Sequence, residues 1–289
     1  MDWISGIQKA LNYIEKHMEE ELDYADIASQ AACSNYYFQR IFGILCGISL
    51  GEYIRNRRLT LAGSELSKAN RKVVDVALKY GYESPESFTR AFVKFHGITP
   101  SEAKRDGSKL KSYSPLSVQI ILKGGHLMDY KIMEKPAFQV IEKVEKHSIS
   151  DSQQLNTIPE FWGRAHRDGT VAKLLSITSA RNYIFGICYG GDLTDEKTFD
   201  YGIGAEYDGN AEVPEGYRVN EIPARTWAVF EVRGAMPEAI QQLWHNICAE
   251  FFPASEYQPT YEMDIEVYPA GDMTAPDYHS EIWVPVVKK

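Results

Sequence analysis

Two copies of one short pattern restrict the fold of this chain more than any other feature of its sequence. The first copy runs from Asp26 to Gly47, DIASQAACSNYYFQRIFGILCG, and the second from Asp75 to Gly97, DVALKYGYESPESFTRAFVKFHG. The opening tripeptides at 26–28 and 75–77 are 49 positions apart. Four later pairs are 50 positions apart, namely Phe38 with Phe88, Arg40 with Arg90, Phe42 with Phe92 and Gly47 with Gly97. The copies therefore differ by one residue, which falls in the turn.

Each copy has the features of a helix-turn-helix. Ala28 and Ala77 are small residues at the positions where two helices have to cross closely. Ser34 and Ser84 can each accept a hydrogen bond from the free amides that open the next helix, and Pro85 suits a first turn. Each second helix is therefore expected to begin sharply and to end at the glycine that closes its copy.

The second helix of each copy has one apolar face and one polar face. In the first copy the predicted buried stripe is Phe38, Ile41, Phe42 and Leu45, which leaves Tyr36, Gln39 and Arg40 facing outward. In the second copy Phe88, Ala91, Phe92 and Phe95 face inward, which leaves Glu86, Ser87, Thr89, Arg90 and Lys94 outward. Arginine, glutamine and glutamate can read base edges in a major groove. The alternative is a pair of helical hairpins that only pack.

One continuous helix is expected between the copies, from Ser49 to Lys68. Twenty residues span roughly 30 Å, which is close to the roughly 34 Å between successive major grooves on one face of DNA. One chain can thus address two adjacent grooves, and we expect a monomer. Arg55, Arg57 and Arg58 lie on this helix and are candidates for phosphate contacts, although each also fits a solvated face.

Charge is distributed unevenly along the 289 residues. The net charge is −9, but residues 22–105 carry 12 Lys and Arg against 8 Asp and Glu, whereas residues 108–289 carry 17 against 26. The helix-turn-helix region is therefore mildly basic, as DNA binding requires. The four cysteines form no CxxC pair and the seven histidines have no metal-ligand spacing, so we expect no metal and no cofactor. Neither secretion nor a membrane span is indicated, and the expected location is the cytoplasm.

Residues 106–116 (DGSKLKSYSPL) are rich in turn-forming residues and indicate a linker, after which the pattern changes from helical to alternating. Strands are predicted at Ser117–Lys123, Phe138–Val144, Tyr183–Tyr189, Arg225–Val232, Met263–Tyr268 and Glu281–Val287. Helices are predicted at Ile158–Arg167, continuing through Val171–Leu175, and at Met236–Phe251. This order predicts an α+β domain with two similar halves around an antiparallel sheet.

Two predicted strands place a carboxylate beside an aromatic ring. Glu266 and Tyr268 share one face of their strand, and Glu281 and Trp283 share one face of theirs, because side chains alternate along a strand. Such pairs suit an apolar cation, since aromatic faces attract cations and a carboxylate can pair with the charge. The alternative is that both glutamates lie on a solvent face.

The duplicated region resembles the DNA-binding domain of the AraC/XylS family of transcription regulators over about residues 5–106. The resemblance rests on IASQAACSNYYFQRIFGILCGISLGEYIRNRRL and on DVALKYGYESPESFTRAFVKFHGITPSEAKR, which follows the family signature. Tyr36 stands where the family often has tryptophan, and Glu86 where it often has glutamine. The resemblance implies two DNA-reading helices whose sequence preference differs accordingly.

The C-terminal region looks like the GyrI-like effector-binding domain. The resemblance rests on EGYRVNEIPARTWAVFEVRG, YEMDIEVY and EIWVPV. It implies that a carboxylate of the last strands faces a ligand groove, Glu281 in the first place and Glu266 in the second. Other matching positions, each also explained as core, are Trp162, Tyr183, Phe185, Tyr189 and Trp227.

We therefore expect two domains in the order of Rob-like regulators, 1–107 for DNA binding and 112–289 for effector binding. The predicted function is a transcription regulator that is not an enzyme, whose partners are promoter DNA, a small amphipathic or cationic effector and RNA polymerase. One alternative is a hydrolase with Glu266 or Glu281 as general base, although the chain lacks a G-x-S-x-G elbow and a phosphate-binding loop. The other is a protein-interaction module.

Overall fold

The computed structural model describes residues 3–68, 71–118, 128–148, 153–178, 183–190 and 198–289. They form two compact units. One contains residues 33–47 together with the chain from residue 121 onward, and the other contains residues 2–32 and 48–120. In the part of the chain that is described, no helix is long and apolar enough to cross a membrane.

The N-terminal part is helical, as predicted. Its helices are α1 (Trp3–Lys16), α2 (Tyr24–Gln30), α3 (Asn35–Cys46), α4 (Leu50–Lys68), α5 (Val73–Lys79), α6 (Pro85–His96) and α7 (Pro100–Ala103). Ser34 accepts a hydrogen bond from the amide of Tyr37, and Ser84 from that of Ser87, so the predicted caps of α3 and α6 are confirmed. Gly47 and Gly97 end these helices with φ of 69° and 81°, a conformation that favours glycine.

The second helix-turn-helix has a well-defined core. Phe88 and Phe92 of α6 are fully buried and pack with Ala77 of α5 and with Leu59 and Leu66 of α4. Ala91 and Phe95, also predicted to face inward, are half-buried and pack against the same core. The small residue predicted at the crossing of the two helices is therefore where the packing requires it.

Arg57 of α4 is a structural residue, and its predicted phosphate contact is wrong. Its guanidinium donates to both oxygens of Glu15 on α1, at 2.9 and 2.7 Å, and to the carbonyl of Tyr113. Arg58 similarly donates to the carbonyls of Met18 and Glu20, whereas Arg55 is exposed. Of the three arginines on α4, Arg55 alone remains a candidate for a phosphate.

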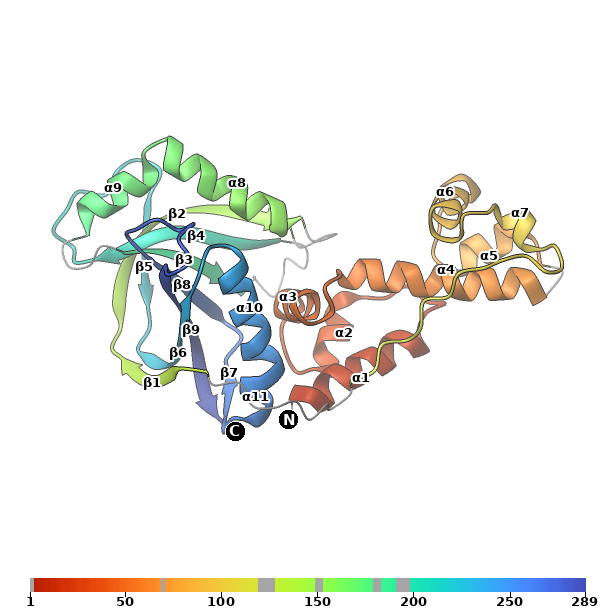
Figure 1. Ribbon diagram of the computed structural model, residues 1–289, viewed down its shortest axis with the longest axis horizontal. Helices are drawn as coiled ribbons and strands as arrows, with labels where there is room; N and C mark the ends of the chain where they lie inside the picture. The colour runs from red at the N-terminus through yellow and green to blue at the C-terminus, as the bar shows by residue number, and fades with distance from the viewer. Residues whose placement is uncertain (1–2, 69–70, 119–127, 149–152, 179–182, 191–197) are drawn as a thin grey trace. The chain divides into compact units, whose positions relative to one another are not determined.

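The predicted linker is held along the helices of its unit (Figure 1). Its amides donate at Lys111 to Nδ1 of His96, at Tyr113 to the hydroxyl of Thr60 and at Leu116 to the hydroxyl of Tyr53. The amide of Val118 donates to Gln8 on α1. Residues 111–118 therefore belong to the packed helical unit.

The C-terminal part is an antiparallel sheet with helices inserted between its strands. In chain order the elements are β1 (Tyr130–Lys135), β2 (Phe138–Ser148), α8 (Gln154–Arg167), α9 (Thr170–Ile177), β3 (Tyr183–Tyr189), β4 (Thr198–Tyr207), β5 (Arg218–Ile222), β6 (Arg225–Arg233), α10 (Glu238–Asn246), the π-helical turn η2 (Ile247–Phe251), α11 (Phe252–Ala254), β7 (Tyr257–Pro259), β8 (Met263–Pro269) and β9 (His279–Lys288).

The strand order confirms two similar halves. It runs β1-β6-β9-β8-β3-β4-β2-β5, with the short β7 beside β9. Counted from the two ends inward, β1 corresponds to β5, β6 to β2, β9 to β4 and β8 to β3. The two halves meet where β3 pairs with β8.

A sequence repeat that the sequence analysis did not predict accompanies this symmetry. YKIMEKPA at 130–137 matches YRVNEIPA at 217–224, with a spacing of 87 residues. The two segments form β1 and β5, and each leads into the next strand along the chain, β2 or β6, which lies in the other half of the sheet. The prolines at 136 and 223 stand between these consecutive strands, where a missing amide donor is tolerated.

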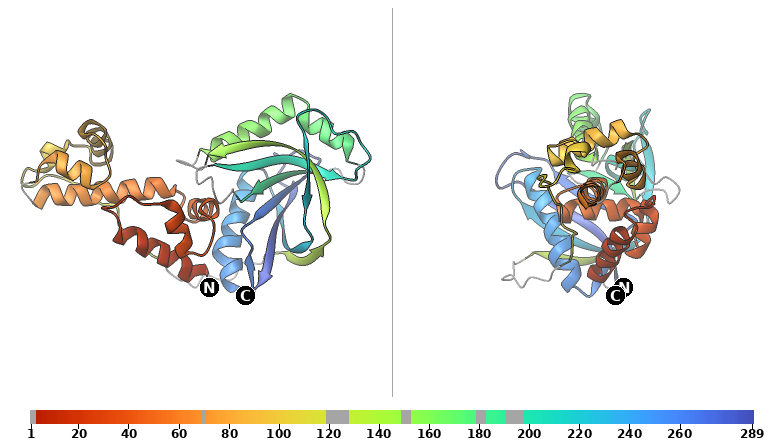
Figure 2. Two further views of the ribbon diagram at one scale, coloured as in Figure 1. Left: turned by 180° about the vertical axis from the view of Figure 1, so that it is seen from behind. Right: turned by 90° about the vertical axis from the view of Figure 1, so that its right-hand side faces the viewer.

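The two faces of the sheet are covered differently. Helices α8 and α9 pack on one face against Ile141, Phe199 and Ile203. The sheet is curved, as Figure 2 shows. Its other face encloses its own side chains, among them Phe185, Trp227 and Ile265, all fully buried. We call these the helix-bearing face and the concave face.

Some predicted boundaries were wrong. Gly169, at φ 82°, separates α8 from α9, so the predicted continuation is a separate helix. Ser117 and Val118 lie outside any strand, and the rest of the strand predicted at 117–123 lies outside the described residues. The strands β1, β4, β5 and β7 were missed.

We expect Arg57→Met to lower the free energy of unfolding by about 2 kcal/mol, because it leaves the half-buried Glu15 carboxylate without its cation. Arg55→Met, two residues earlier on the exposed side of α4, should change it by less than about 0.5 kcal/mol. Urea denaturation of the full chain, followed by helical circular dichroism, measures both. Equal effects of the two changes would contradict the structural role of Arg57.

Candidate functional site

The two predicted carboxylates lie on opposite faces of the sheet. In the pairing of β8 with β9, Glu281 stands opposite Val267, and directly paired residues point to the same side. Glu266, the neighbour of Val267, therefore points to the other side. The two candidates for the groove carboxylate, Glu281 and Glu266, thus lie on different faces, and two separate acidic sites result.

The first site lies on the helix-bearing face, and we call it the acidic aromatic cluster. Its members are Trp162 of α8, Tyr201 of β4, Trp244 of α10, and Asp264, Glu266 and Tyr268 of β8. The alternating positions 264, 266 and 268 bring the three β8 side chains to one face. Glu266 accepts a hydrogen bond from Nε1 of Trp244 at 2.8 Å and one from the hydroxyl of Tyr268 at 2.9 Å. Both donors are neutral, so they orient the carboxylate without neutralising its charge.

Aromatic rings surround this carboxylate. Trp162 packs edge-on against Tyr268 with centroids 5.1 Å apart, and its Nε1 donates to the hydroxyl of Tyr201 at 2.9 Å. Gly186 of β3 stands opposite Glu266, where a Cβ atom would come within 2.3 Å of that hydroxyl. Glycine at this position leaves room for the rings where the two halves of the sheet meet.

Helix α3, which belongs to the same compact unit as the sheet, contacts the acidic aromatic cluster. The guanidinium of Arg40 forms an ion pair with Asp264 and lies 4.4 Å from the ring centroid of Trp244. The hydroxyl of Tyr36 is hydrogen-bonded to Cys188, and its ring packs on Phe199 at 4.4 Å. The prediction that Tyr36 and Arg40 face outward is therefore wrong in this structure, because the C-terminal sheet covers both.

Burial sets the ionisation of this region. It raises the pKa of Asp264 to about 6, against the lowering effect of the Arg40 guanidinium. Burial likewise raises the pKa of the Cys188 thiol to about 12. Oδ1 of Asp264 is buried and has no hydrogen-bond partner within the described part of the chain. This carboxylate therefore keeps unused capacity to accept a donor.

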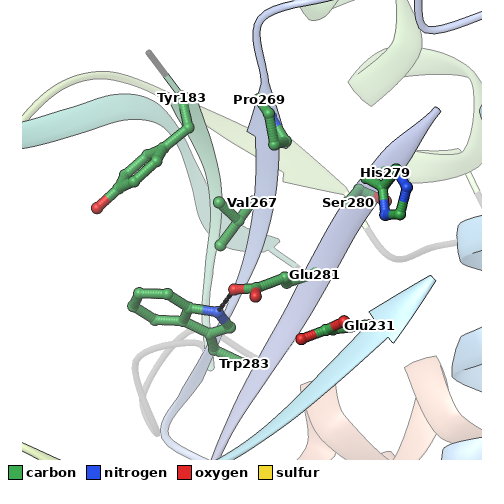
Figure 3. Close-up of a pocket in the computed structure, with 8 residues that line it drawn as sticks. All are labelled: Tyr183, Glu231, Val267, Pro269, His279, Ser280, Glu281 and Trp283. Carbon is green, nitrogen blue, oxygen red and sulfur yellow. Dashed lines mark hydrogen bonds between the residues drawn. The ribbon is translucent and has the colours of Figure 1, made fainter. Parts of the chain in front are cut away.

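The second site is a cavity of about 390 Å³ around Glu281 (Figure 3). Its lining includes Tyr183, Glu231, Val267 and Trp283. The indole of Trp283 donates to Glu281 at 2.6 Å. Lys131 of β1 lies 3.2 Å from Glu281 and 3.6 Å from Glu231. The two carboxylates therefore already share a lysine of the same chain.

The remaining predicted ligand residues lie on the concave face. Phe185 and Trp227 are fully buried there, and Tyr183 donates to Glu206 at 2.8 Å. Tyr189 donates to Glu142 at 2.7 Å. These four residues belong to the packed interior of the curved sheet, in agreement with their alternative interpretation as core residues. Tyr183 also borders the cavity around Glu281.

Glu142 of β2 is a third carboxylate, which was not among the predicted site residues. It is fully buried and bonded by Tyr189 and by Nε of Arg218 at 2.9 Å. Gly202 makes room for it, because a Cβ atom there would lie 2.1 Å from Oε2 of Glu142. Arg218 is the counterpart of Lys131 in the repeat, so each half of the sheet has a cation on its edge strand paired with an inner carboxylate.

The predicted DNA-reading side of α6 is open to solvent. Glu86, Arg90 and Lys94 are exposed, and Ser87 and Thr89 are half-exposed. On α3, Gln39 is half-exposed and donates to Asn35 at 2.8 Å.

These observations define a class, a duplicated helix-turn-helix followed by a domain with two acidic sites, one of them a cavity of ligand size. A family model described as GyrI-like small molecule binding domain matches residues 128–287, and one described as Helix-turn-helix domain matches residues 27–106. The chain belongs to the GyrI-like family and carries an AraC-type helix-turn-helix domain in front of it.

Similarity to curated relatives is concentrated in about a third of the chain. The right origin-binding protein of Escherichia coli K12 is 35% identical over 105 residues, which are 36% of this chain and 36% of that protein. Regulatory protein SoxS of Salmonella typhimurium is 38% identical over 96 residues, 33% of this chain and 90% of that protein. The matched region thus spans little more than a third of the right origin-binding protein's own length.

Among solved structures, SAV2435 bound to tetraphenylphosphonium is similar over 55% of this chain and 94% of its own. The sequence identity is 26% and the TM-score is 0.50.

We expect Glu142→Gln to lower the free energy of unfolding by about 2 kcal/mol at pH 5, because it removes a buried carboxyl group that accepts hydrogen bonds from Tyr189 and Arg218. Burial raises the pKa of Glu142 in the folded protein, so the folded state binds its proton more tightly than the unfolded state does. The stability that this group contributes is thus present at low pH and lost as the pH rises through the folded pKa. The difference in the free energy of unfolding between the parent and Glu142→Gln should therefore become smaller from pH 5 to pH 8.

Urea denaturation at several pH values measures this difference. Glu145→Gln, three residues along the same strand and half-exposed, is the control and should cost less than about 0.5 kcal/mol throughout. A stability difference between the parent and Glu142→Gln that grows with rising pH would contradict a raised pKa of Glu142 in the folded protein.

Proposed function

We propose that this protein is a DNA-binding transcription regulator whose C-terminal domain binds an organic cation and thereby modulates transcription. The observation that carries the proposal is the acidic aromatic cluster, where a guanidinium already lies against Trp244, beside Asp264. A face that accepts one cation between a ring and carboxylates has the chemistry to accept another.

The DNA-binding half of the proposal rests on α6. Its exposed side combines Arg90, which can pair with guanine, with Glu86, which can accept from cytosine, and with Lys94 for a phosphate. The opposite side of the helix is anchored by Phe88 and Phe92. A rigid helix with a mixed polar face is the usual form of a major-groove reader.

The effector-binding half rests on charge and aromatic area. Glu266 is held by two neutral donors, so its charge is available to a ligand, and among the described residues Oδ1 of Asp264 has no hydrogen-bond partner. Trp162, Tyr201 and Tyr268 supply apolar surface around it. The structural relative SAV2435 takes tetraphenylphosphonium, an aromatic monocation, which makes that compound a suitable probe.

The cavity around Glu281 is the alternative position for the effector. It has a suitable size, since ligand pockets measure about 300–1,000 Å³. However, both of its carboxylates already pair with Lys131, whereas Glu266 accepts hydrogen bonds from two neutral groups, Trp244 and Tyr268. We therefore place the effector at Glu266, with Glu281 as the competing assignment.

We expect Glu266→Gln to weaken the binding of tetraphenylphosphonium about tenfold, because loss of one desolvated charge interaction is worth about 1.4 kcal/mol or more. Glu281→Gln should leave the affinity within about twofold of the parent. Calorimetric titration of the intact chain measures both. The opposite ranking of the two variants would move the effector to the cavity around Glu281, and no binding by the parent would remove the cationic effector.

For DNA, we expect Arg90→Ala to weaken binding to duplexes selected from a random pool about tenfold and to relax the selected sequence at one position, as loss of a base contact does. Lys104→Ala changes an exposed lysine that lies outside α6 and should retain the selected sequence. An Arg90→Ala protein that selects the parental sequence with parental affinity would remove α6 as the reader.

A further inference from the structure

The contact of α3 with the acidic aromatic cluster has the composition of a bound ligand. Arg40 supplies a planar cation and Tyr36, four residues earlier and hence on the same side of the helix, supplies an aromatic ring. The cation pairs with Asp264 and lies over Trp244, while the ring enters the core beside Phe199 and Tyr201. Tyr37 adds a second ring, packed on Tyr261 at 4.3 Å.

The ion pair between Arg40 and Asp264 holds α3 on the cluster. The Arg40 side chain is 15% exposed and that of Asp264 is 4% exposed, so neither charge is well solvated without the other. Nδ1 of His245 on α10 also lies 3.3 Å from the carbonyl of Ile44 near the end of α3. The ion pair and this contact, together with the rings of Tyr36 and Tyr37, hold α3 on the sheet.

The second copy provides an internal comparison. At the spacing of 50 residues, Tyr36 corresponds to Glu86, Tyr37 to Ser87 and Arg40 to Arg90. Glu86 and Arg90 are exposed, and the sequence at 86–87 has no aromatic ring to enter an apolar site. The two tyrosines thus distinguish α3, which packs on the sheet, from α6, whose matching residues are Glu86 and Ser87.

We infer that Arg40 and Tyr36 form an internal occupant of the effector site, so that α3 and an organic cation compete for the acidic aromatic cluster. This inference rests on the proposed function, since it regulates the same site. A cation that lies over Trp244 and pairs with Asp264 takes the position of the Arg40 guanidinium. Tyr36 and Arg40 are predicted to contact DNA, and the same two side chains are held by the C-terminal sheet domain. Helix α3 therefore cannot occupy the cluster and a major groove at the same time.

The competition has a defined consequence for affinity. If the cluster is free of α3 in only a fraction of the molecules, the apparent dissociation constant of the cation is raised by the inverse of that fraction. Weakening the α3 contact removes this penalty. A cation that releases α3 from the cluster makes α3 available to DNA and so raises the affinity for DNA. Because such coupling is reciprocal, DNA bound to α3 raises the affinity for the cation by the same factor.

The test is calorimetric titration of tetraphenylphosphonium into the full-length parent, Arg40→Gln and Arg90→Gln. Arg40→Gln removes the internal cation and should bind the probe about tenfold more tightly, as expected when the competent fraction rises from about one tenth to nearly one. Arg90→Gln removes the equivalent arginine of the second copy, which is exposed, and should bind the probe with parental affinity although its DNA binding falls.

Tyr36→Glu is the second variant, in case Arg40→Gln perturbs the fold. It introduces the residue found at the matching position of the second copy, and it places a like charge near Asp264 and Glu266. It should also bind the probe more tightly than the parent. Circular dichroism of each variant verifies that the helices and the sheet are retained.

The outcomes separate the two proposals. Tighter binding by both α3 variants, with Arg90→Gln unchanged, supports the competition. Binding that is equal in all four proteins overturns the competition and leaves the cationic effector in place. Weaker binding by Arg40→Gln or Tyr36→Glu overturns it as well, because it would make α3 a wall of the site and not its competitor. No binding by any of the proteins overturns the proposed effector and the competition together.

Discussion

The pairing of β3 with β8 is the interaction on which the C-terminal domain depends. It joins the two halves of the sheet, and its register places Gly186 directly opposite Glu266. Because paired residues point to one side, the smallest residue and the acidic residue meet at the junction, and the rings of Trp162 and Tyr201 fill the space that the glycine leaves. A shift of one residue in this register would move the carboxylate to the concave face, among packed apolar side chains.

The sequence predicted the helices of the N-terminal part well because their signals are local. The caps at Ser34 and Ser84, the closing glycines and the apolar stripe around Phe88 and Phe92 act within a few residues of the backbone that they shape. The strands with strong apolar patterns, such as 183–189, were also found. The missed strand β5 is short and its outer residues are exposed, so the pattern there is weak.

The candidate site could be predicted only in part. Glu266 and Tyr268 were found from strand alternation, and the same alternation would have added Asp264. The partition of Glu266 and Glu281 between two faces could not be predicted, because it depends on the pairing of β8 with β9, which is not encoded in either strand alone. The burial of Tyr36 and Arg40 was likewise hidden, since helical periodicity gives the side of a helix but not what covers it.

Both parts of the chain are duplicated, and in each part the two copies differ in how much of their polar surface is buried. In the sheet, the Arg218 half encloses its carboxylate completely, while the Lys131 half leaves a cavity beside Glu281. In the helices, one copy carries tyrosines that dock on the sheet, and the other keeps a polar surface. Duplication thus lets two copies keep the same packing and differ in chemistry. The matched arginines at 40 and 90 differ in this way, since Arg40 is paired with Asp264 and Arg90 is exposed.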